Sequence, residues 1–253
     1  MTRRAVALVA ALVLAALGSG VPAGATKEKL SGPVTVFAAS SLKESFTAIQ
    51  KDFNKKYPDV TVTFDFDASS NLAAQIQQGA PADVFASADE ANLQKTIDSG
   101  DAVPPPVVFA KNRLEIAVER GNPKKIKGLA DLAKSGLVVV LCADEAPCGK
   151  YAARAFANAG VSVSPASKEE NAKATLSKVA LGEADASVVY VTDVKAAKNT
   201  VSGVRIPDAQ NVIATYPTAE LTRSKTAAAK AWIVFLATKS ARTTLRKFGF
   251  VLP

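Results

Sequence analysis

The stretch VTVFAASSLKESFTAIQKDF, residues 34–53, joins an expected strand to an expected helix and decides the fold class. Four of its first five residues are apolar and the run favours β-structure, which predicts a buried strand over 34–38. Four apolar residues then recur at spacings of four, three and four: Leu42, Phe46, Ile49 and Phe53. This spacing places them on one face of a helix over 42–57, which Pro58 ends. A strand followed by a covering helix is the unit of an α/β fold.

The same rhythm of strand and helix runs through the rest of the chain. We expect further strands at 60–66, 83–86, 137–141 and 186–191, and helices at 71–79, 90–98, 149–159, 168–181, 226–236 and 240–248. After three prolines, two strand-like runs at 107–111 and 113–119 cross to a second lobe, and 212–216 returns. The prediction is an α/β protein of two Rossmann-like lobes with mixed or parallel sheets and a ligand cleft between them. Lobe 1 is 33–110 plus 217–253, and lobe 2 is 111–216.

Residues 1–25 have the pattern of an export signal. Arg3 and Arg4 supply the positive start, an aliphatic run over 5–17 follows, and the small-residue pattern ends at Ala25. This run is too short to span about 30 Å of hydrocarbon as a helix. We expect cleavage near Ala25 and a linker over 26–32. Because no cysteine lies near the cleavage site, we also expect a periplasmic or secreted protein without a lipid anchor.

The composition excludes several classes of function. The chain has no histidine, which removes the usual general base, the histidine-dependent nucleophile pairs and the commonest transition-metal ligand. We therefore expect no enzyme, no catalytic residue and no cofactor. The formal net charge is +8, or about +6 once Arg3 and Arg4 are removed, and no basic block with interleaved aromatics occurs. This mild excess predicts weak attraction of anions rather than nucleic-acid binding.

Two serine pairs stand where strands meet helices. Ser40 and Ser41 follow the first strand, and Ser69 and Ser70 follow the second. One interpretation is helix capping, since a serine hydroxyl accepts a hydrogen bond from a first-turn N–H. The other is an anion site, in which hydroxyl and backbone donors of two helix N-termini converge at the carboxyl ends of the strands. Two equivalent junctions favour the anion site.

Other side chains in these loops offer competing interpretations. Four are acidic: Asp65, Asp67, Asp144 and Glu145. An acid/base pair or a hard-cation site would need a geometry that their spacing does not fix, so we expect solvated positions. A secreted serine hydrolase, with Ser40 or Ser41 as nucleophile and Lys43 as base, is the remote alternative. The partner motifs K-T-G and S-D-N of that enzyme class are absent from the sequence.

The two cysteines, Cys142 and Cys148, enclose the five residues ADEAP. In an exported protein a local disulfide between them would persist, and we expect one. A reduced pair is the alternative. A metal pair is disfavoured, because its further ligands would have to be carboxylates.

Five strings of the sequence resemble the periplasmic molybdate-binding proteins of ABC importers, the ModA family, which are class II periplasmic binding proteins. They are VTVFAASSL (34–42), FDASSNLAAQI (66–76), GAPADVFASAD (79–89), APCGKYA (146–152) and GEADASVVYVTD (182–193). Together they cover, in order, nearly the whole chain after the signal. The resemblance implies a type II periplasmic-binding-protein fold, in which neutral donors hold an unhydrated tetrahedral oxyanion between two lobes.

Matched residue by residue, the resemblance implies five contacts to the oxyanion: the hydroxyls of Ser41, Ser69 and Tyr190 and the backbone N–H groups of Cys148 and Ala172. Ser70 is the alternative to Ser69, and the string around Ala172 departs from the family's usual one. The implied ligand is molybdate, with tungstate as a second ligand, bound without any direct metal ligand. Sulfate or phosphate is the alternative. The implied partner is the transmembrane permease of an ABC importer. We expect the protein itself to be a monomer.

Overall fold

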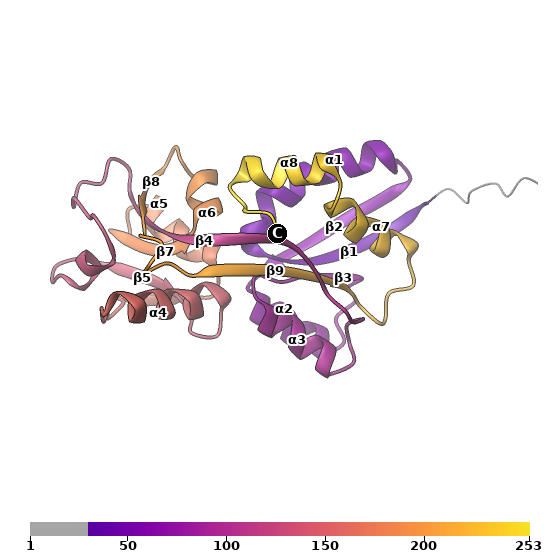
Figure 1. The fold of residues 1–253 in the computed structure, drawn as a ribbon, viewed down its shortest axis with the longest axis horizontal. Coiled ribbons are helices and arrows are strands. Elements are labelled where there is room, and N and C mark those ends of the chain that lie inside the picture. The colour runs from indigo at the N-terminus through magenta and orange to yellow at the C-terminus, as the bar shows by residue number, and fades with distance from the viewer. Residues whose placement is uncertain (1–29) are drawn as a thin grey trace, which may run out of the picture.

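The computed structural model describes residues 30–253, so the expected signal peptide and most of the expected linker lie outside the described residues. Within this range the strands form one nine-stranded mixed sheet in the order β2-β1-β3-β9-β4-β7-β5-β6, with β8 paired to β4. Helices cover the sheet on both faces (Figure 1). No helix in this part of the chain is long and apolar enough to cross a membrane.

Residues 32–98 build three parallel strands and the helices that follow them. β1 (Gly32–Ala39) lies between β2 (Val60–Asp67) and β3 (Val84–Ala86). The 3-10 helix η1 (Ser40–Leu42) runs directly into α1 (Lys43–Lys56), and α2 (Ser69–Gln77) and α3 (Glu90–Asp98) follow the other two strands. The apolar face of α1 is buried, as its spacing predicts. The three strands therefore present their carboxyl ends to one edge of the sheet.

The second half of the sheet has its own parallel strands. β5 (Val139–Cys142) lies between β6 (Ser167–Glu169) and β7 (Ala186–Tyr190). The 3-10 helix η2 (Leu129–Ala133) precedes β5, and the helices of this half are α4 (Pro147–Ala159), α5 (Ala172–Ala180) and α6 (Val191–Ala196). The helix predicted over 168–181 is wrong at its start, because the chain there pairs with β5 as a strand. Sequence patterning also missed α6 and β8 (Val201–Arg205), which are only six and five residues long.

Two long strands connect the halves of the sheet. β4 (Val107–Glu119) is one continuous strand rather than the two predicted runs, because its first half pairs with β9 (Ile213–Glu220) and its second half with β7 and β8. β9 extends beyond the predicted 212–216, because it also pairs with β3. The predicted lobe boundaries, 110/111 and 216/217, fall inside these two strands and stay a prediction.

The two C-terminal helices are α7 (Ala227–Leu236) and α8 (Lys239–Phe248), close to the predicted ranges. Both pack against α1, and these three helices lie together on one face of the sheet, near β1 and β2 (Figure 1). Trp232 of α7 is fully buried, with its ring edge-on to Phe46 and Phe53 of α1 at 5.4 and 5.2 Å between centroids. This aromatic cluster fixes α1, and hence the junction between β1 and α1, against the sheet.

Candidate anion-binding site

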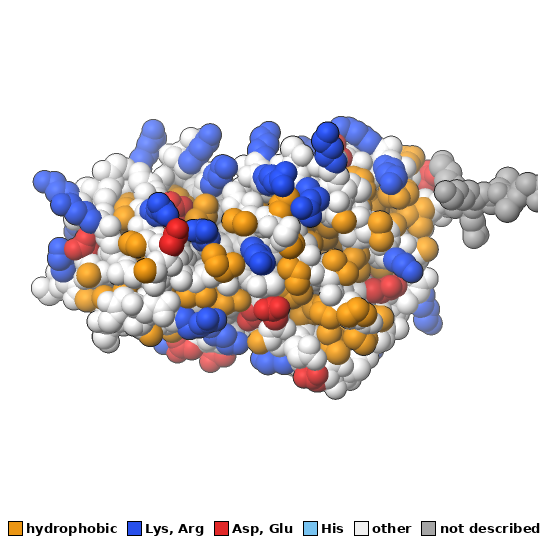
Figure 2. Space-filling model, in the orientation of Figure 1, with side chains coloured by type: hydrophobic (Ala, Val, Ile, Leu, Met, Phe, Trp, Pro, Cys, Tyr) orange, Lys and Arg blue, Asp and Glu red, His pale blue; other side chains and the backbone are white. Residues whose placement is uncertain are grey.

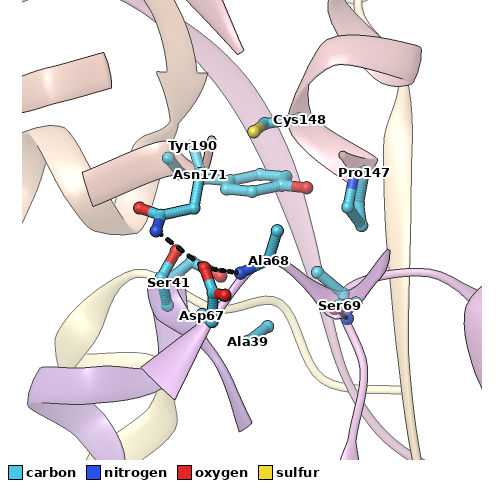
Figure 3. A pocket seen from close by; sticks show the side chains of 12 residues that line it. Ala39, Ser41, Asp67, Ala68, Ser69, Pro147, Cys148, Asn171 and Tyr190 are labelled. Atoms are coloured by element: carbon cyan, nitrogen blue, oxygen red, sulfur yellow. Dashed lines mark hydrogen bonds between the residues drawn. The ribbon is translucent and has the colours of Figure 1, made fainter. Parts of the chain in front are cut away.

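One small cavity lies where β1, β2, β5 and β7 end, and Figure 3 shows it from close by. It contains about 200 Å³ of empty space, part of which is open to solvent. All five residues that the resemblance implies as contacts line it: Ser41, Ser69, Cys148, Ala172 and Tyr190. Ser70 is not among the lining residues, so the structure brings its neighbour Ser69 to the cavity instead.

Three of the helical segments that begin at this cavity have no side-chain cap. The N-cap residues of η1, α2 and α4 are Ala39, Ala68 and Ala146, and none of these segments has a capping side-chain hydrogen bond. Alanine is a poor N-cap, and the first N–H groups of a helix have no acceptor within it. The capping interpretation of the serine pairs is therefore wrong, since both pairs lie inside the first helical turn. The free N–H groups can bind an anion.

The fourth helix at the cavity, α5, has a cap of a different kind. The side-chain oxygen of Asn171 accepts hydrogen bonds from the N–H groups of Lys173 and Ala174, both at 3.0 Å. Ala172 is the first residue of the helix, so its own N–H has no acceptor within α5. Asn171 thus satisfies the second and third donors and leaves the first for a ligand in the cavity.

The two cavity serines are oriented by hydrogen bonds in which each serine oxygen can act as the acceptor. The Ser69 oxygen accepts the N–H of Ala88 at 2.9 Å. The Ser41 oxygen lies 2.8 Å from the Tyr216 hydroxyl, whose oxygen in turn accepts from the side-chain amide of Asn112 at 3.4 Å. Because an amide N–H only donates, Tyr216 can give its hydrogen to Ser41. Both serine hydroxyls can therefore donate to an anion in the cavity.

The Tyr190 hydroxyl is the clearest sign that the cavity binds something. Tyr190 is only 2 % exposed, and its oxygen has no hydrogen-bond partner in the described part of the chain. Figure 3 shows its ring extending across the cavity toward Pro147. Burial raises the pKa of this phenol well above its ordinary value, so it remains a protonated donor. A buried unsatisfied hydroxyl is costly, and an anionic oxygen in the cavity would satisfy it.

Cys148 is held by a disulfide at the start of α4. The predicted bond between Cys142 and Cys148 is present, and it ties the end of β5 to the first turn of the helix. The next residue, Gly149, packs so closely on this loop that a Cβ there would collide with the carbonyl oxygen of Ala143. The backbone N–H of Cys148 is therefore fixed in place at the edge of the cavity.

The cavity is lined almost entirely by uncharged residues. Among residues 30–253 no lysine or arginine lines it, and the only carboxylate that does belongs to Asp67. Asp67 is half-buried, so its expected solvated position is wrong; Asp65, Asp144 and Glu145 are exposed, as expected. The Asp67 oxygens accept hydrogen bonds from the Ala68 N–H at 2.6 Å and from the side chains of Asn71 and Asn171, both at 2.9 Å. The Asp67 carboxylate is thus already hydrogen-bonded to three protein donors.

Two alternatives from the sequence, a metal site and a serine hydrolase with a lysine base, can be compared with residues 30–253. No group of three or more Cys, Asp or Glu side chains in this range could hold a metal ion. Lys43, the base of the hydrolase alternative, is exposed, and in the described structure no hydrogen bond joins its side chain to Ser40 or Ser41. The arrangement is suited to holding an oxyanion with neutral donors.

Sequence reasoning missed three residues that shape this site: Asn112, Asn171 and Tyr216. The signal for Asn171 was present, since an asparagine before an alanine-rich helix is a typical N-cap. Asn112 and Tyr216 lie on β4 and β9, far from the junction motifs, and only the pairing of these strands brings them to Ser41. No local pattern could have found them.

Three comparisons place the chain among known proteins. The family model described as bacterial extracellular solute-binding protein matches residues 34–251. The molybdate-binding protein ModA of Mycobacterium tuberculosis is 39 % identical over 252 residues, which cover 97 % of both chains. Among solved structures, the periplasmic molybdate-binding protein of Azotobacter vinelandii has a TM-score of 0.75 at 22 % identity, covering 87 % of this chain and 99 % of that one. The sulfate-binding protein SubI of M. tuberculosis has a TM-score of 0.76 at 20 % identity, covering 87 % and 86 %.

These findings confirm the predicted fold class, that of the periplasmic binding proteins, and the expectation that the chain is not an enzyme. They also agree with a place outside the cytoplasm, where proteins of this class act. The chain belongs to the bacterial extracellular solute-binding proteins and, within them, to the family of the molybdate-binding proteins ModA.

Proposed function

We propose that this protein binds molybdate, and also tungstate, outside the cytoplasm and delivers the anion to the permease of an ABC importer. The observation that carries the proposal is the buried Tyr190 hydroxyl without a partner, which faces a cavity surrounded by uncapped helix N-termini. An unhydrated tetrahedral dianion has the acceptor atoms that these donors lack. The contacts proposed are the hydroxyls of Tyr190, Ser41 and Ser69 and the N–H groups of Cys148 and Ala172.

Neutral donors suit a ligand that must be released. Several hydrogen bonds and the partial positive charges of helix N-termini compensate a buried dianion without a fixed countercharge. The surface charge supports capture at a distance, because Lys and Arg side chains project along the whole upper edge of the molecule in Figure 2, over both halves of the sheet. A field of this sign attracts anions weakly and loses strength as salt increases.

The choice of molybdate over sulfate rests on the relatives rather than on the fold. The ModA relative is 39 % identical over almost the whole chain, whereas a sulfate-binding protein has a TM-score as high as that of a molybdate-binding one. Sulfate and molybdate carry the same charge and have the same shape. Discrimination therefore depends on cavity size, and it has to be measured.

The test is thermal unfolding of the protein from residue 26 onward, with molybdate, tungstate, sulfate or phosphate added. An anion at a hundredfold excess over its Kd should stabilise the fold by about 2.7 kcal/mol. We expect molybdate and tungstate to raise the midpoint and sulfate to leave it unchanged. Stabilisation by sulfate or phosphate alone would contradict the choice of ligand, and no effect of any oxyanion would contradict the binding function.

Delivery needs a separate test. The cognate importer, reconstituted in vesicles with this protein enclosed on its extracytoplasmic side, should hydrolyse ATP faster when molybdate is added. An unchanged rate in vesicles whose enclosed protein binds molybdate would contradict delivery while leaving binding intact.

A further inference from the structure

In the described part of the chain, two polar contacts from the start of α5 connect the two sides of the cavity, one from its N-cap residue and one from its first turn. The side-chain nitrogen of Asn171 donates to Asp67, at the end of β2, at 2.9 Å. The ammonium group of Lys173 lies 2.8 Å from Glu44 of α1. Glu44 and Asp67 belong to the side built by β1 and β2, whereas Asn171 and Lys173 belong to the side built by β5 and β7.

Asn171 connects closure of the cavity to the position of a ligand donor. Its oxygen holds the N–H groups of Lys173 and Ala174, which orients the first turn of α5 and leaves the Ala172 N–H for the anion. Its nitrogen meanwhile reaches across the cavity to Asp67. One side chain, only 8 % exposed, thus both presents a donor and holds the opposite wall.

Lys173 is placed for the same purpose. It lies between Glu44 and the buried carboxylate of Asp193, 3.1 Å away on α6. Burial lowers the pKa of Lys173, but the two carboxylates outweigh it and the pKa is raised, so the side chain is charged. Asp193 also accepts the Tyr190 N–H at 3.2 Å, which connects this ion pair to the strand end that carries the free hydroxyl.

A separate hollow between α3 and α4 follows the cavity residues Ala88 and Pro147 in the sequence. It is lined by Asp89, Glu90 and Ala91 on one side and by Lys150, Tyr151 and Arg154 on the other. Within residues 30–253 no hydrogen bond or ion pair joins α3 to α4. The polar contacts that hold the cavity shut are therefore concentrated at one edge.

We propose that Asn171 and Lys173 form a latch, the α5 latch, that sets how long the closed cavity retains its anion. The proposal rests on the proposed function for the identity of the ligand, but not for the closing contacts. The latch residues act as positioning residues, since the anion is held by the donors described above. Breaking the latch should accelerate release of the anion and leave its association nearly unchanged.

Two substitutions break the latch without removing the cap or a buried charge. Asn171→Ser keeps an oxygen that caps α5 but loses the donor to Asp67. Glu44→Gln removes the half-buried carboxylate of the ion pair and leaves Lys173 with Asp193. Glu183→Gln is the matched control, because it removes an ion pair of similar length, 2.7 Å to Lys178, from the same helix far from the cavity.

The measurement is the release rate of radiolabelled molybdate chased with excess unlabelled molybdate. We expect release to be about tenfold faster in each single variant and faster still in the double variant, with association within about twofold of wild type. Glu183→Gln should release at the wild-type rate. Unchanged release in both latch variants, or an equal acceleration in the control, would overturn the proposal.

A second measurement tests the latch without a ligand. Spin labels on the variants Glu90→Cys and Lys150→Cys, on opposite sides of the open hollow, report the width of the cavity in the ligand-free protein. We expect a short-distance population that shrinks when Glu44→Gln and Asn171→Ser are added. An unchanged distance distribution would overturn the latch even if the protein bound no molybdate, so failure of the latch and failure of the proposed function can be told apart.

Discussion

Three helical segments that start at the cavity differ from three helices that start elsewhere. The helices α3, α7 and α8 are capped by the side chains of Asp89, Thr226 and Thr238, whereas η1, α2 and α4 begin after alanines that cap nothing. A missing cap costs about 1 kcal/mol of stability. At α5, which also starts at the cavity, Asn171 caps the second and third N–H groups and leaves that of Ala172 free. The 3-10 helix η2, away from the cavity, lacks a side-chain cap as well. The uncapped donors at the cavity are the ones that we propose to bind a ligand.

The largest effect should follow removal of both cavity serines. Ser41→Ala combined with Ser69→Ala deletes two donors to a charged ligand, each worth about 1.5–3 kcal/mol. We expect molybdate affinity, measured by calorimetric titration, to fall at least about a hundredfold. Ser70→Ala is the control, since Ser70 does not line the cavity, and it should change the affinity less than about twofold. Equal losses in the control and the double variant would contradict the site.

Tyr190→Phe should separate binding from stability. The variant loses the free hydroxyl, so affinity should fall by about ten- to a hundredfold, the loss of one hydrogen bond to a charged group. The ligand-free protein should become more stable by about 1 kcal/mol in urea unfolding, because the variant no longer buries an unsatisfied hydroxyl. A less stable protein would show that the hydroxyl has a partner inside the fold.

Adding a side-chain cap to α4 should reduce anion binding, because the cap would occupy N–H groups that are now free. Ala146→Ser supplies an oxygen that accepts the N–H of Cys148 or Gly149 and competes with the anion for it. We expect molybdate affinity to fall about tenfold while the ligand-free protein unfolds at an equal or higher urea concentration. Unchanged affinity in a stabilised variant would mean that these donors do not contact the ligand.

The reverse change at the capped helices should alter stability alone. Thr226→Ala and Thr238→Ala remove the caps of α7 and α8, and each should lower the free energy of unfolding by about 1 kcal/mol. Calorimetric titration should give wild-type affinity for both, because neither helix starts at the cavity. A drop in affinity would show that binding follows global stability rather than the donors.

The smallest effect should be that of pH. Burial raises the pKa of Tyr190, so its neutral, donating form persists above the range in which an exposed tyrosine titrates, and the chain has no histidine. Loss of the donor would occur only as pH rises through that raised pKa. We expect the affinity for molybdate to vary less than about twofold between roughly pH 6 and 9. A step within this range would reveal a titrating contact.

The sequence predicted much of this arrangement, because the decisive signals are local. The apolar face of α1 and the short cysteine loop each depend on neighbouring residues, and both predictions were confirmed. The serine pairs are also a local signal, and the structure places Ser41 and Ser69 at the cavity, while their binding of an anion stays a prediction. The missed parts depend on pairing between distant segments. Asn112 and Tyr216 reach Ser41 because β4 pairs with β9, and the half-buried Asp67 accepts a hydrogen bond from Asn171, more than a hundred residues away in the sequence.

The most direct test is a crystal structure of the protein with molybdate, the metal being located by its anomalous scattering. The account predicts one anion in the cavity, with oxygens about 2.7–2.9 Å from the Tyr190 hydroxyl and the serine hydroxyls, and within hydrogen-bond distance of the Cys148 and Ala172 N–H groups. An anion bound through a lysine or arginine, or one bound outside this cavity while Tyr190 stays without a partner, would contradict it.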